Sequence, residues 1–264
     1  MGSVQADVRY INPEWRDRPE APAIGDRESR HANTSYFEVE IHDARTPGLD
    51  LGLDESGFEL TSAQPLTCDL DKESVLHDYR PAMLDLVARE TGAIATYMWF
   101  HLIRTEDQSN FNTAYSRFVH CDFHVDRMAK MTSNLLKKNG VSPEPAWSYA
   151  WINTWQPFDH PVEEHPLAVI DVRSLAAGDL IDYQYTGYEN SDGLVTAPVY
   201  SDQHEWFTFP SMALDEVLLT KQLEGRPGRA VQCPHTSFAD PGSSATAAPR
   251  RSVETRVLAV FEAE

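Results

Sequence analysis

The second half of the chain is a succession of short alternating segments separated by turn residues, and this pattern limits the fold more than any other feature. The clearest segment is WSYAWINTWQP, in which one strand face carries Trp147, Tyr149, Trp151, Asn153 and Trp155. Six further segments follow, punctuated by Gly, Pro and Asp: LAVIDV, LIDYQY, EWFTFP, EVLLTKQ, RAVQCPHTSF and SVETRVLAVF. Many short strands with turn signals predict a β-sandwich or jelly roll rather than alternating strands and helices.

The first half of the chain predicts fewer strands, together with helices. Residues 36–60 are typical of short strands and a hairpin, and AIATYMWFHLI indicates a buried strand. Apolar residues recur at helical spacing over 71–91, where Pro81 suits the first turn of a second helical piece and Gly92 suits its end. A further helix is expected over 126–138. The fold class is therefore expected to be mainly β with flanking helices.

The domain organisation expected from these patterns is simple. Residues 1–35 are rich in Pro, Arg and Asp and have little periodicity, so we expect an irregular N-terminal arm. Residues 36–264 are expected to form a single jelly-roll domain, because a chain of 264 residues is long enough for one large domain.

Charge and composition narrow the classes of function. The net charge of −19 and the lack of a Lys/Arg-rich run argue against binding to nucleic acid or to anionic membranes. No apolar stretch reaches the roughly 20 residues of a membrane span, and the N-terminus has no apolar signal core. Three cysteines without a CxxC pair fit a reducing compartment. We expect a cytoplasmic protein, a monomer or a homodimer, that acts on a small molecule.

The stretch FVHCDFHVD holds two overlapping His-x-Asp patterns. The first is His120 with Asp122, and the second is His124 with Asp126. Side chains two residues apart on a strand point to the same side of it. Each pair therefore brings two metal-binding side chains towards one point, which makes both pairs candidates for a metal site.

The residues around these pairs favour the first one. Phe118 and Val119 are typical of a strand that leads into His120, whereas Asp126 suits the N-cap of the following helix. His124 is then expected in the pocket or at the helix entry. A zinc-type His-xxx-His made of His120 and His124 stays open as an alternative, although it requires a helix here.

A His and a carboxylate on one strand need a distant second His to complete a 2-His-1-carboxylate facial triad. Such a triad holds Fe(II) on one face and leaves three positions open. Among the ten histidines, His235 is the best candidate, because it lies near the end of a late strand. A buried core histidine would be the simpler interpretation of His235 if no further ligand-binding pattern came after it.

An Arg-x-Ser lies downstream of His235, at the start of the last predicted strand. Arg250 and Ser252 share a strand face by the period-two rule. A guanidinium fork with a hydroxyl beside it binds a carboxylate well, because the fork reaches both oxygens. Arg251 and Arg256 are competing candidates, and Arg256 lies on the same face as Arg250 and Ser252.

The order His-x-Asp, distant His, Arg-x-Ser resembles the signature of the Fe(II)/2-oxoglutarate-dependent oxygenases. Other segments are EVEIHDAR, LDESGFEL, NTWQP before HPLAVIDVRSL, WFTFPSMALDEVLLTKQ, and HTSFADP before PRRSVETR. Together they resemble the fungal and bacterial hydroxylase/desaturase family, which includes aspergillic-acid-pathway, gibberellin desaturase-like and cephamycin methoxylation-component-like proteins. The resemblance extends from about residue 37 to the C-terminus. One departure is Gln156, where many relatives have Arg.

This resemblance implies a double-stranded β-helix (jelly roll) in which His120, Asp122 and His235 bind Fe(II). It also implies that Arg250 and Ser252 hold the far carboxylate of 2-oxoglutarate, the cosubstrate used with O₂. The implied reaction is hydroxylation, desaturation or oxidative cyclisation of a small molecule, in secondary metabolism.

Two other classes of function stay open. A non-redox zinc hydrolase would use His120, His124 and His235 as ligands and would not need the Arg-x-Ser. A non-catalytic jelly-roll binding module would keep the fold without needing the metal.

Overall fold

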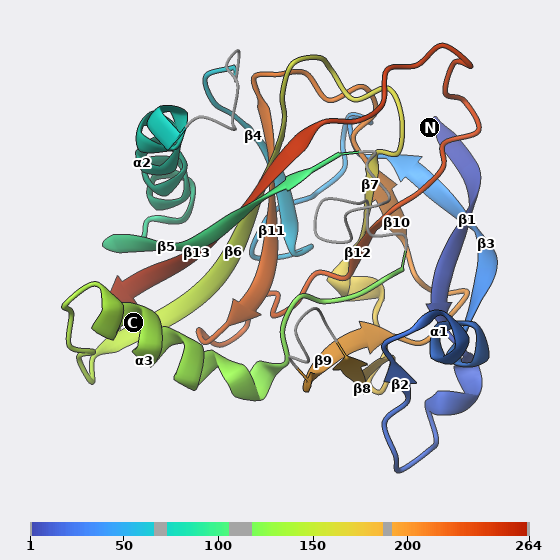
Figure 1. Cartoon of the computed structure of the whole chain (residues 1–264), viewed down its shortest axis with the longest axis horizontal. Coiled ribbons are helices and arrows are strands. Elements are labelled where there is room, and N and C mark those ends of the chain that lie inside the picture. The colour runs from blue at the N-terminus through green and yellow to red at the C-terminus, as the bar shows by residue number, and fades with distance from the viewer. Residues whose placement is uncertain (1, 66–72, 106–117, 187–191, 263–264) are drawn as a thin grey trace.

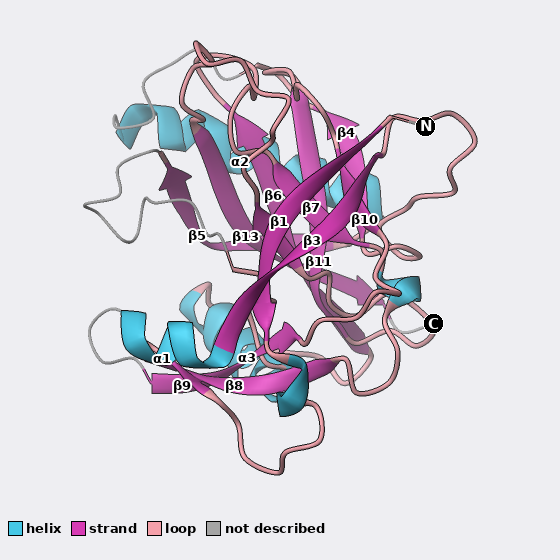
Figure 2. Ribbon diagram, turned by 90° about the vertical axis from the view of Figure 1, so that its right-hand side faces the viewer, coloured by secondary structure: helices cyan, strands magenta, loops and turns pink. Residues whose placement is uncertain are grey.

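The architecture is a pair of five-stranded β-sheets with a smaller third sheet (Figures 1 and 2). The structure is a computed structural model that describes residues 2–65, 73–105, 118–186 and 192–262. The first sheet has the order β1 (Ser3–Ile11), β3 (Thr34–Asp43), β10 (Trp206–Thr208), β7 (Leu167–Ile170) and β12 (His235–Ser237). The second has the order β4 (Phe58–Ser62), β11 (Glu216–Glu224), β6 (Trp147–Pro157), β13 (Ser252–Glu262) and β5 (Ala95–Arg104). The third contains β2 (Ala23–Ile24), β8 (Leu180–Thr186) and β9 (Asp192–Pro198).

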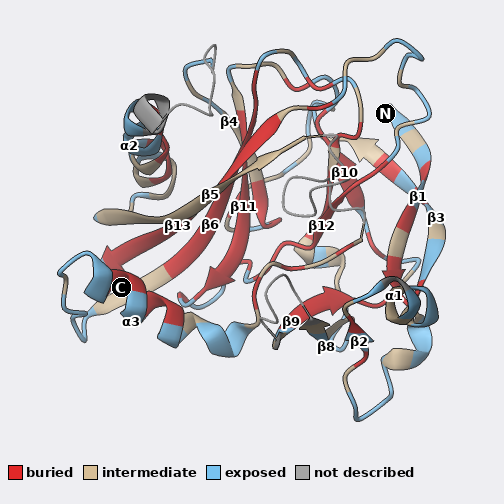
Figure 3. Ribbon diagram, viewed as in Figure 1, coloured by how far each residue is buried: buried red, intermediate tan, exposed pale blue. Residues whose placement is uncertain are grey.

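The two large sheets pack against each other through a shared apolar cluster. Trp155 and Leu218 from the second sheet meet Val169 and Phe207 from the first. The central strands β6, β11 and β13 are buried along most of their length (Figure 3). The predicted mainly β jelly roll is therefore confirmed, because alternating strands bury one face between two sheets.

The two longer helices pack on opposite faces of the second sheet. α2 (Glu73–Thr91) packs through Met83 and Val87 on Ile152 and Val257, whereas α3 (Met128–Lys138) packs through Leu135 on Trp151 and Leu258 of the other face. The short helix α1 (Arg27–Asn33) lies beside β2 and β3, and 3₁₀ helices are present at Pro13–Trp15, Val125–Arg127 and Val172–Ser174. None of the helices in the described ranges is long and apolar enough to cross a membrane.

The sequence expectation for α2 is partly wrong. Pro81 lies inside one continuous helix and does not begin a second piece. Burial of Met83 and Val87 against the sheet stabilises the helix on the far side of the proline, which outweighs the lost backbone hydrogen bond. The expected stop is confirmed, since Gly92 follows the helix with a left-handed φ of 70°.

The N-terminal segment is not the irregular arm expected over residues 1–35. β1 pairs antiparallel with β3 along its whole length, and α1 begins at a capping box between Asp26 and Ser29. The strand forms because Ala6, Val8 and Tyr10 alternate with polar residues and are buried on one side.

Two further expectations for the first half need correction. β3 and β4 do not form a hairpin, because β3 pairs with β1 and β10 whereas β4 pairs with β11 of the other sheet. β5 is not a buried strand: it lies at the end of its sheet, and all its residues are only partly buried.

Candidate metal centre

The fold brings together the three residues that the sequence predicts as metal ligands. One ligand-type atom from each of His120, Asp122 and His235 lies within 4.8 Å of the others. His120 is not in a long strand but in an isolated antiparallel bridge to His235, the first residue of β12. The two backbones exchange hydrogen bonds of 3.2 and 3.1 Å, so residues far apart in sequence are fixed side by side.

Backbone carbonyls determine which nitrogen of each imidazole faces the centre. Nδ1 of His120 lies 2.7 Å from the carbonyl oxygen of Phe118, and Nδ1 of His235 lies 3.0 Å from that of Cys233. A carbonyl oxygen only accepts, so each Nδ1 carries the proton and donates it, which makes Nε2 the metal-binding nitrogen. The Nε2 atoms lie 3.7 and 3.8 Å from the two carboxylate oxygens of Asp122.

The carboxylate of Asp122 is held by two donors. Arg256 Nη2 donates to Oδ1 over 2.7 Å, and Asn153 Nδ2 donates to Oδ2 over 2.6 Å. Burial alone would raise the pKa of Asp122, but the charge of Arg256, followed by the two histidines, outweighs it and keeps that pKa well below its usual range. Burial, followed by the neighbouring His235, lowers the pKa of His120 to about 4. The site therefore presents an anionic carboxylate and, at His120, a neutral imidazole, which are the protonation states that a metal requires.

This donor set fits a facial triad. Two imidazole nitrogens and one carboxylate suit Fe(II) in a site with open positions. Ligands at about 2.1 Å from a metal in neighbouring positions are roughly 3 Å apart, closer than the 3.7 and 3.8 Å between the imidazole nitrogens and the Asp122 oxygens. A small inward shift of the side chains would therefore close the site around an ion.

His124 lies outside this group and has a different role. Its Nδ1 accepts a hydrogen bond of 3.1 Å from the backbone N–H of Asp126, and its Nε2 lies 3.0 Å from Asp182 Oδ1. His124, rather than Asp126, is therefore the N-cap of the 3₁₀ turn that leads into α3. The zinc-type pair of His120 and His124 would require a helix here, and none is present over this described stretch.

Arg250 and Ser252 are both buried at the start of β13. The Arg250 side chain is 2% exposed, donates from Nη1 to the carbonyl of His165 over 2.5 Å, and lies 5.4 Å from the ring of Trp155. The hydroxyl of Ser252 is fully buried and has no hydrogen-bond partner among the described residues. A buried hydroxyl without a partner is costly, so it fits a position that a ligand completes.

The two competing arginines are engaged elsewhere. Arg251 pairs with Asp159 at the surface. Arg256 binds Asp122 and, through Nε, Glu254 Oε1 over 2.9 Å. Arg256 is therefore a hydrogen-bond partner of the Asp122 carboxylate in the candidate metal centre.

Several polar residues that support the centre were not predicted from the sequence. The sequence places Asn153 on the aromatic face of β6 and indicates no role for it. A single amide among aromatic side chains was the available signal, and its partner is the carboxylate of Asp122. Gln222 Oε1 accepts from the backbone N–H of Asp122 over 3.3 Å, and Gln232 Nε2 donates to the carbonyl of Phe123 over 2.6 Å.

Gln156, where relatives were expected to have Arg, donates instead to two backbone carbonyls, those of Gln64 and Leu214.

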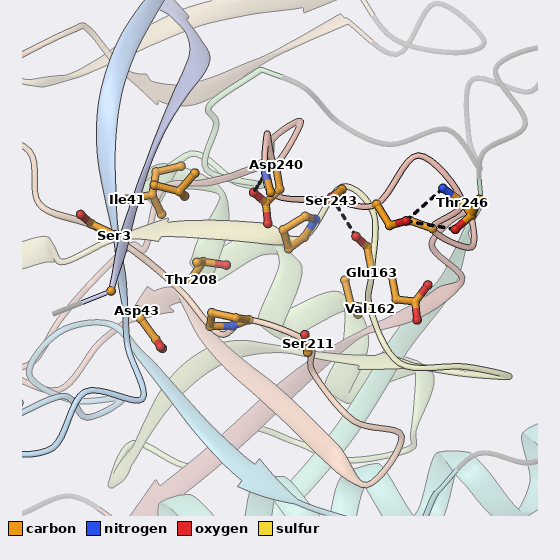
Figure 4. A pocket seen from close by; sticks show the side chains of 17 residues that line it. Ser3, Ile41, Asp43, Val162, Glu163, Thr208, Ser211, Asp240, Ser243 and Thr246 are labelled. Atoms are coloured by element: carbon orange, nitrogen blue, oxygen red, sulfur yellow. Dashed lines mark hydrogen bonds between the residues drawn. The ribbon is translucent and has the colours of Figure 1, made fainter.

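A cavity of about 670 Å³ lies away from this centre, between the β1–β3 edge and the loop that follows β12 (Figure 4). The three predicted metal ligands, Arg250 and Ser252 are not among its described lining residues. Its three acidic residues accept hydrogen bonds from nearby backbone N–H groups: Asp43 from Arg45, Glu163 from Ala248 and Asp240 from Gly242. These carboxylates therefore hold the backbone of the surrounding loops in place.

Comparison with known proteins places the fold and the centre in a family. A family model described as an oxidoreductase/YMDC permease-like domain matches residues 8–261. "Hydroxylase/desaturase efuI" of Hormonema carpetanum is 28% identical over 253 residues, covering 85% of this chain and 83% of the relative. "Alpha-ketoglutarate-dependent dioxygenase phiK" of a fungal species is 26% identical, covering 99% and 97%. The solved structure of the "iron and alpha-ketoglutarate-dependent endoperoxidase NvfI" in a second conformation has the same fold, with a TM-score of 0.84, 21% identity and 99% of each chain covered.

The family resemblance predicted from the sequence is therefore confirmed. The chain belongs to this oxidoreductase family, in the hydroxylase/desaturase group of Fe(II)/2-oxoglutarate-dependent oxygenases, which use iron, 2-oxoglutarate and O₂.

Proposed function

We propose that His120, Asp122 and His235 bind Fe(II) in this oxygenase. The observation that carries the proposal is the convergence of one donor atom from each residue within 4.8 Å, with both Nδ1 atoms held by carbonyls. The neutral imidazole of His120 and the anionic carboxylate of Asp122 need no proton loss at neutral pH before they bind a metal.

The same proposal assigns 2-oxoglutarate to the space beside the start of β13. The guanidinium of Arg250 supplies charge and a planar fork for the far carboxylate, and the Ser252 hydroxyl supplies a further donor. The absence of a hydrogen-bond partner for that hydroxyl among the described residues supports this assignment.

When bound, iron with 2-oxoglutarate and O₂ supplies the oxidant for a substrate C–H bond. The protein's own residues hold the reactants. Asn153 and Arg256 fix the orientation of Asp122. The guanidinium of Arg256 in turn lies 5.1 Å from the ring centre of Phe123.

We further propose a small organic substrate that is hydroxylated, desaturated or oxidatively cyclised in secondary metabolism. The names of the relatives support this class. The proposal also includes a cytoplasmic location and a monomeric or homodimeric state. The net charge of −19 supports the lack of nucleic-acid partners.

Single alanine substitutions test the assignment of the ligands. In a succinate-release assay with Fe(II), 2-oxoglutarate and O₂, His120→Ala, Asp122→Ala and His235→Ala should each reduce the rate at least about a hundredfold, because each removes one of three protein ligands. His124→Ala is the matched control, and it should retain most of the rate. Full activity in Asp122→Ala would refute the assignment.

A further inference from the structure

Glu254 of β13 is a buried carboxylate in the interior of the jelly roll. It is directly opposite Trp155 of β6 and Leu102 of β5, and residues directly opposite in a sheet project from the same face. Trp155 packs between the two large sheets, so the Glu254 side chain also projects into the space between them. Only 10% of this side chain is exposed. A buried anionic group between apolar neighbours is costly unless hydrogen bonds compensate it.

Hydrogen bonds compensate only one of the two oxygens of this carboxylate. Oε1 of Glu254 accepts from Arg256 Nε over 2.9 Å and, more weakly, from Asn153 Nδ2 over 3.5 Å. Oε2 lies 3.8 Å from Nη2 of Arg104, which is beyond hydrogen-bonding distance, and no hydrogen bond from the described residues reaches it. A carboxylate oxygen has two lone-pair sites for hydrogen bonds. Oε2 can therefore accept a hydrogen bond from a bound molecule.

The same donors place Glu254 beside the candidate metal centre. Arg256 and Asn153 also donate to the two oxygens of Asp122, over 2.7 and 2.6 Å. Because the two carboxylates share these donors, they lie close together. A molecule that binds at Oε2 of Glu254 is therefore near the candidate metal ligands, where a substrate must be positioned to react.

2-Oxoglutarate does not suit Oε2 of Glu254. Both of its ends are carboxylates, which the charge of Glu254 repels. Its proposed partner Ser252 is two residues away on β13, about 7 Å along the strand, so the two positions are separate. The group that suits Oε2 is a hydrogen-bond donor. The half-buried side chains of Leu102 and Phe100, on the same face of the neighbouring strand, offer apolar contacts beside it.

We propose that Glu254 is a substrate-binding residue that accepts a hydrogen bond from a hydroxyl or amino group of the substrate. The substrate class that follows is an apolar small molecule that carries an O–H or N–H donor close to the C–H bond that is oxidised. The inference rests on the proposed function, because it places this substrate beside the proposed iron site.

Three probes that differ in one group test the inference: 4-fluorobenzylamine, 4-fluorobenzyl alcohol and 4-fluorobenzyl methyl ether. Each is titrated by fluorine NMR with anaerobic protein that carries Fe(II) and 2-oxoglutarate. The same titration with metal-free protein identifies the shifts that depend on the metal. The wild type should bind the protonated amine and the alcohol at least about tenfold more tightly than the ether, because only these two can donate a hydrogen bond to a carboxylate.

Glu254→Gln keeps the size of the side chain and an oxygen for Arg256, but it presents an amide nitrogen in place of Oε2. This variant should bind the amine no more tightly than the ether, because an amide N–H₂ cannot accept a hydrogen bond. Glu262→Gln, at the exposed end of the same strand, is the matched control and should behave as the wild type.

The wild-type titrations decide the inference even if Glu254→Gln does not fold. Equal dissociation constants for the three probes, or no metal-dependent shift in a protein that shows the visible charge-transfer band of Fe(II) and 2-oxoglutarate, would overturn it. An unchanged preference for the amine in folded Glu254→Gln would overturn it as well. Absence of the band in the wild type would instead contradict the proposed function, so the two failures are distinguishable.

Discussion

The imidazoles of His120 and His235 owe their orientation to backbone carbonyls that the sequence does not reveal. The residue types and their order do predict the three candidate ligands that the fold brings together, because a His-x-Asp with a distant His is the donor set of a facial triad. The period-two rule alone could not separate Arg250 from Arg256, since it places both on one face of the last predicted strand, and Arg250 was favoured because it forms the Arg-x-Ser. Only the pairing of β13 with β6 shows that Arg256 is opposite Asn153 and beside Asp122.

Ser252 provides a prediction at this scale, because its buried hydroxyl has no partner in the described part of the chain. Ser252→Ala should leave the stability of the metal-free protein unchanged or slightly higher, because it removes a buried polar group that makes no hydrogen bond there. Its Kd for 2-oxoglutarate, measured anaerobically by titration of the visible band, should rise about tenfold, since one hydrogen bond to a charged group is lost. Ser243→Ala, at the exposed loop, is the control; an unchanged Kd in Ser252→Ala would remove this residue from the site.

At the scale of elements, the sequence predicts most of the strands that follow residue 146, because their alternation is strict and turn residues separate them. It misjudges β1, whose alternating Ala6, Val8 and Tyr10 are interspersed with charged residues. It also misplaces β4, because the sequence carries no signal for which sheet a strand joins. Pairing between distant strands depends on tertiary packing rather than on local propensity.

A buried charge cluster ties β11 to two loops. Lys221 is fully buried, and its Nζ lies 2.6 Å from Asp54 Oδ1 and 2.5 Å from Glu224 Oε2. Arg226 also pairs with Glu224, and Arg229 pairs with Asp54. The loop that carries Arg226 and Arg229 continues to His235, so the cluster helps to hold the approach to the candidate centre.

Removing the charge of Lys221 should therefore be costly. Lys221→Met is expected to lower the free energy of unfolding by roughly 3 kcal/mol, because it leaves the buried carboxylate of Glu224 and the half-buried one of Asp54 without one of their cations. Urea unfolding followed by tryptophan fluorescence measures the change. Arg251→Met, which breaks the exposed pair with Asp159, should cost less than about 1 kcal/mol. A similar small effect at Lys221 would mean that the cluster contributes little.

At the scale of the whole molecule, the two sheets bring together segments that are far apart along the chain. The stretch before α3 supplies His120 and Asp122, β12 supplies His235, and β13 supplies Arg256 and Ser252. The order of the motifs predicts that these residues meet, but it does not predict how the strands bring them together, because no local pattern records which sheet faces which. The polar residues that complete the centre, such as Asn153 and Gln222, reach it only when the sheets are packed.

The most direct test of the iron site is anaerobic addition of Fe(II) and 2-oxoglutarate to the metal-free protein, followed by visible absorption. We predict a weak charge-transfer band that saturates at one equivalent of iron and is absent from His235→Ala. A protein that shows no band and binds zinc tightly in its place would contradict the assignment of His120, Asp122 and His235 as an iron site.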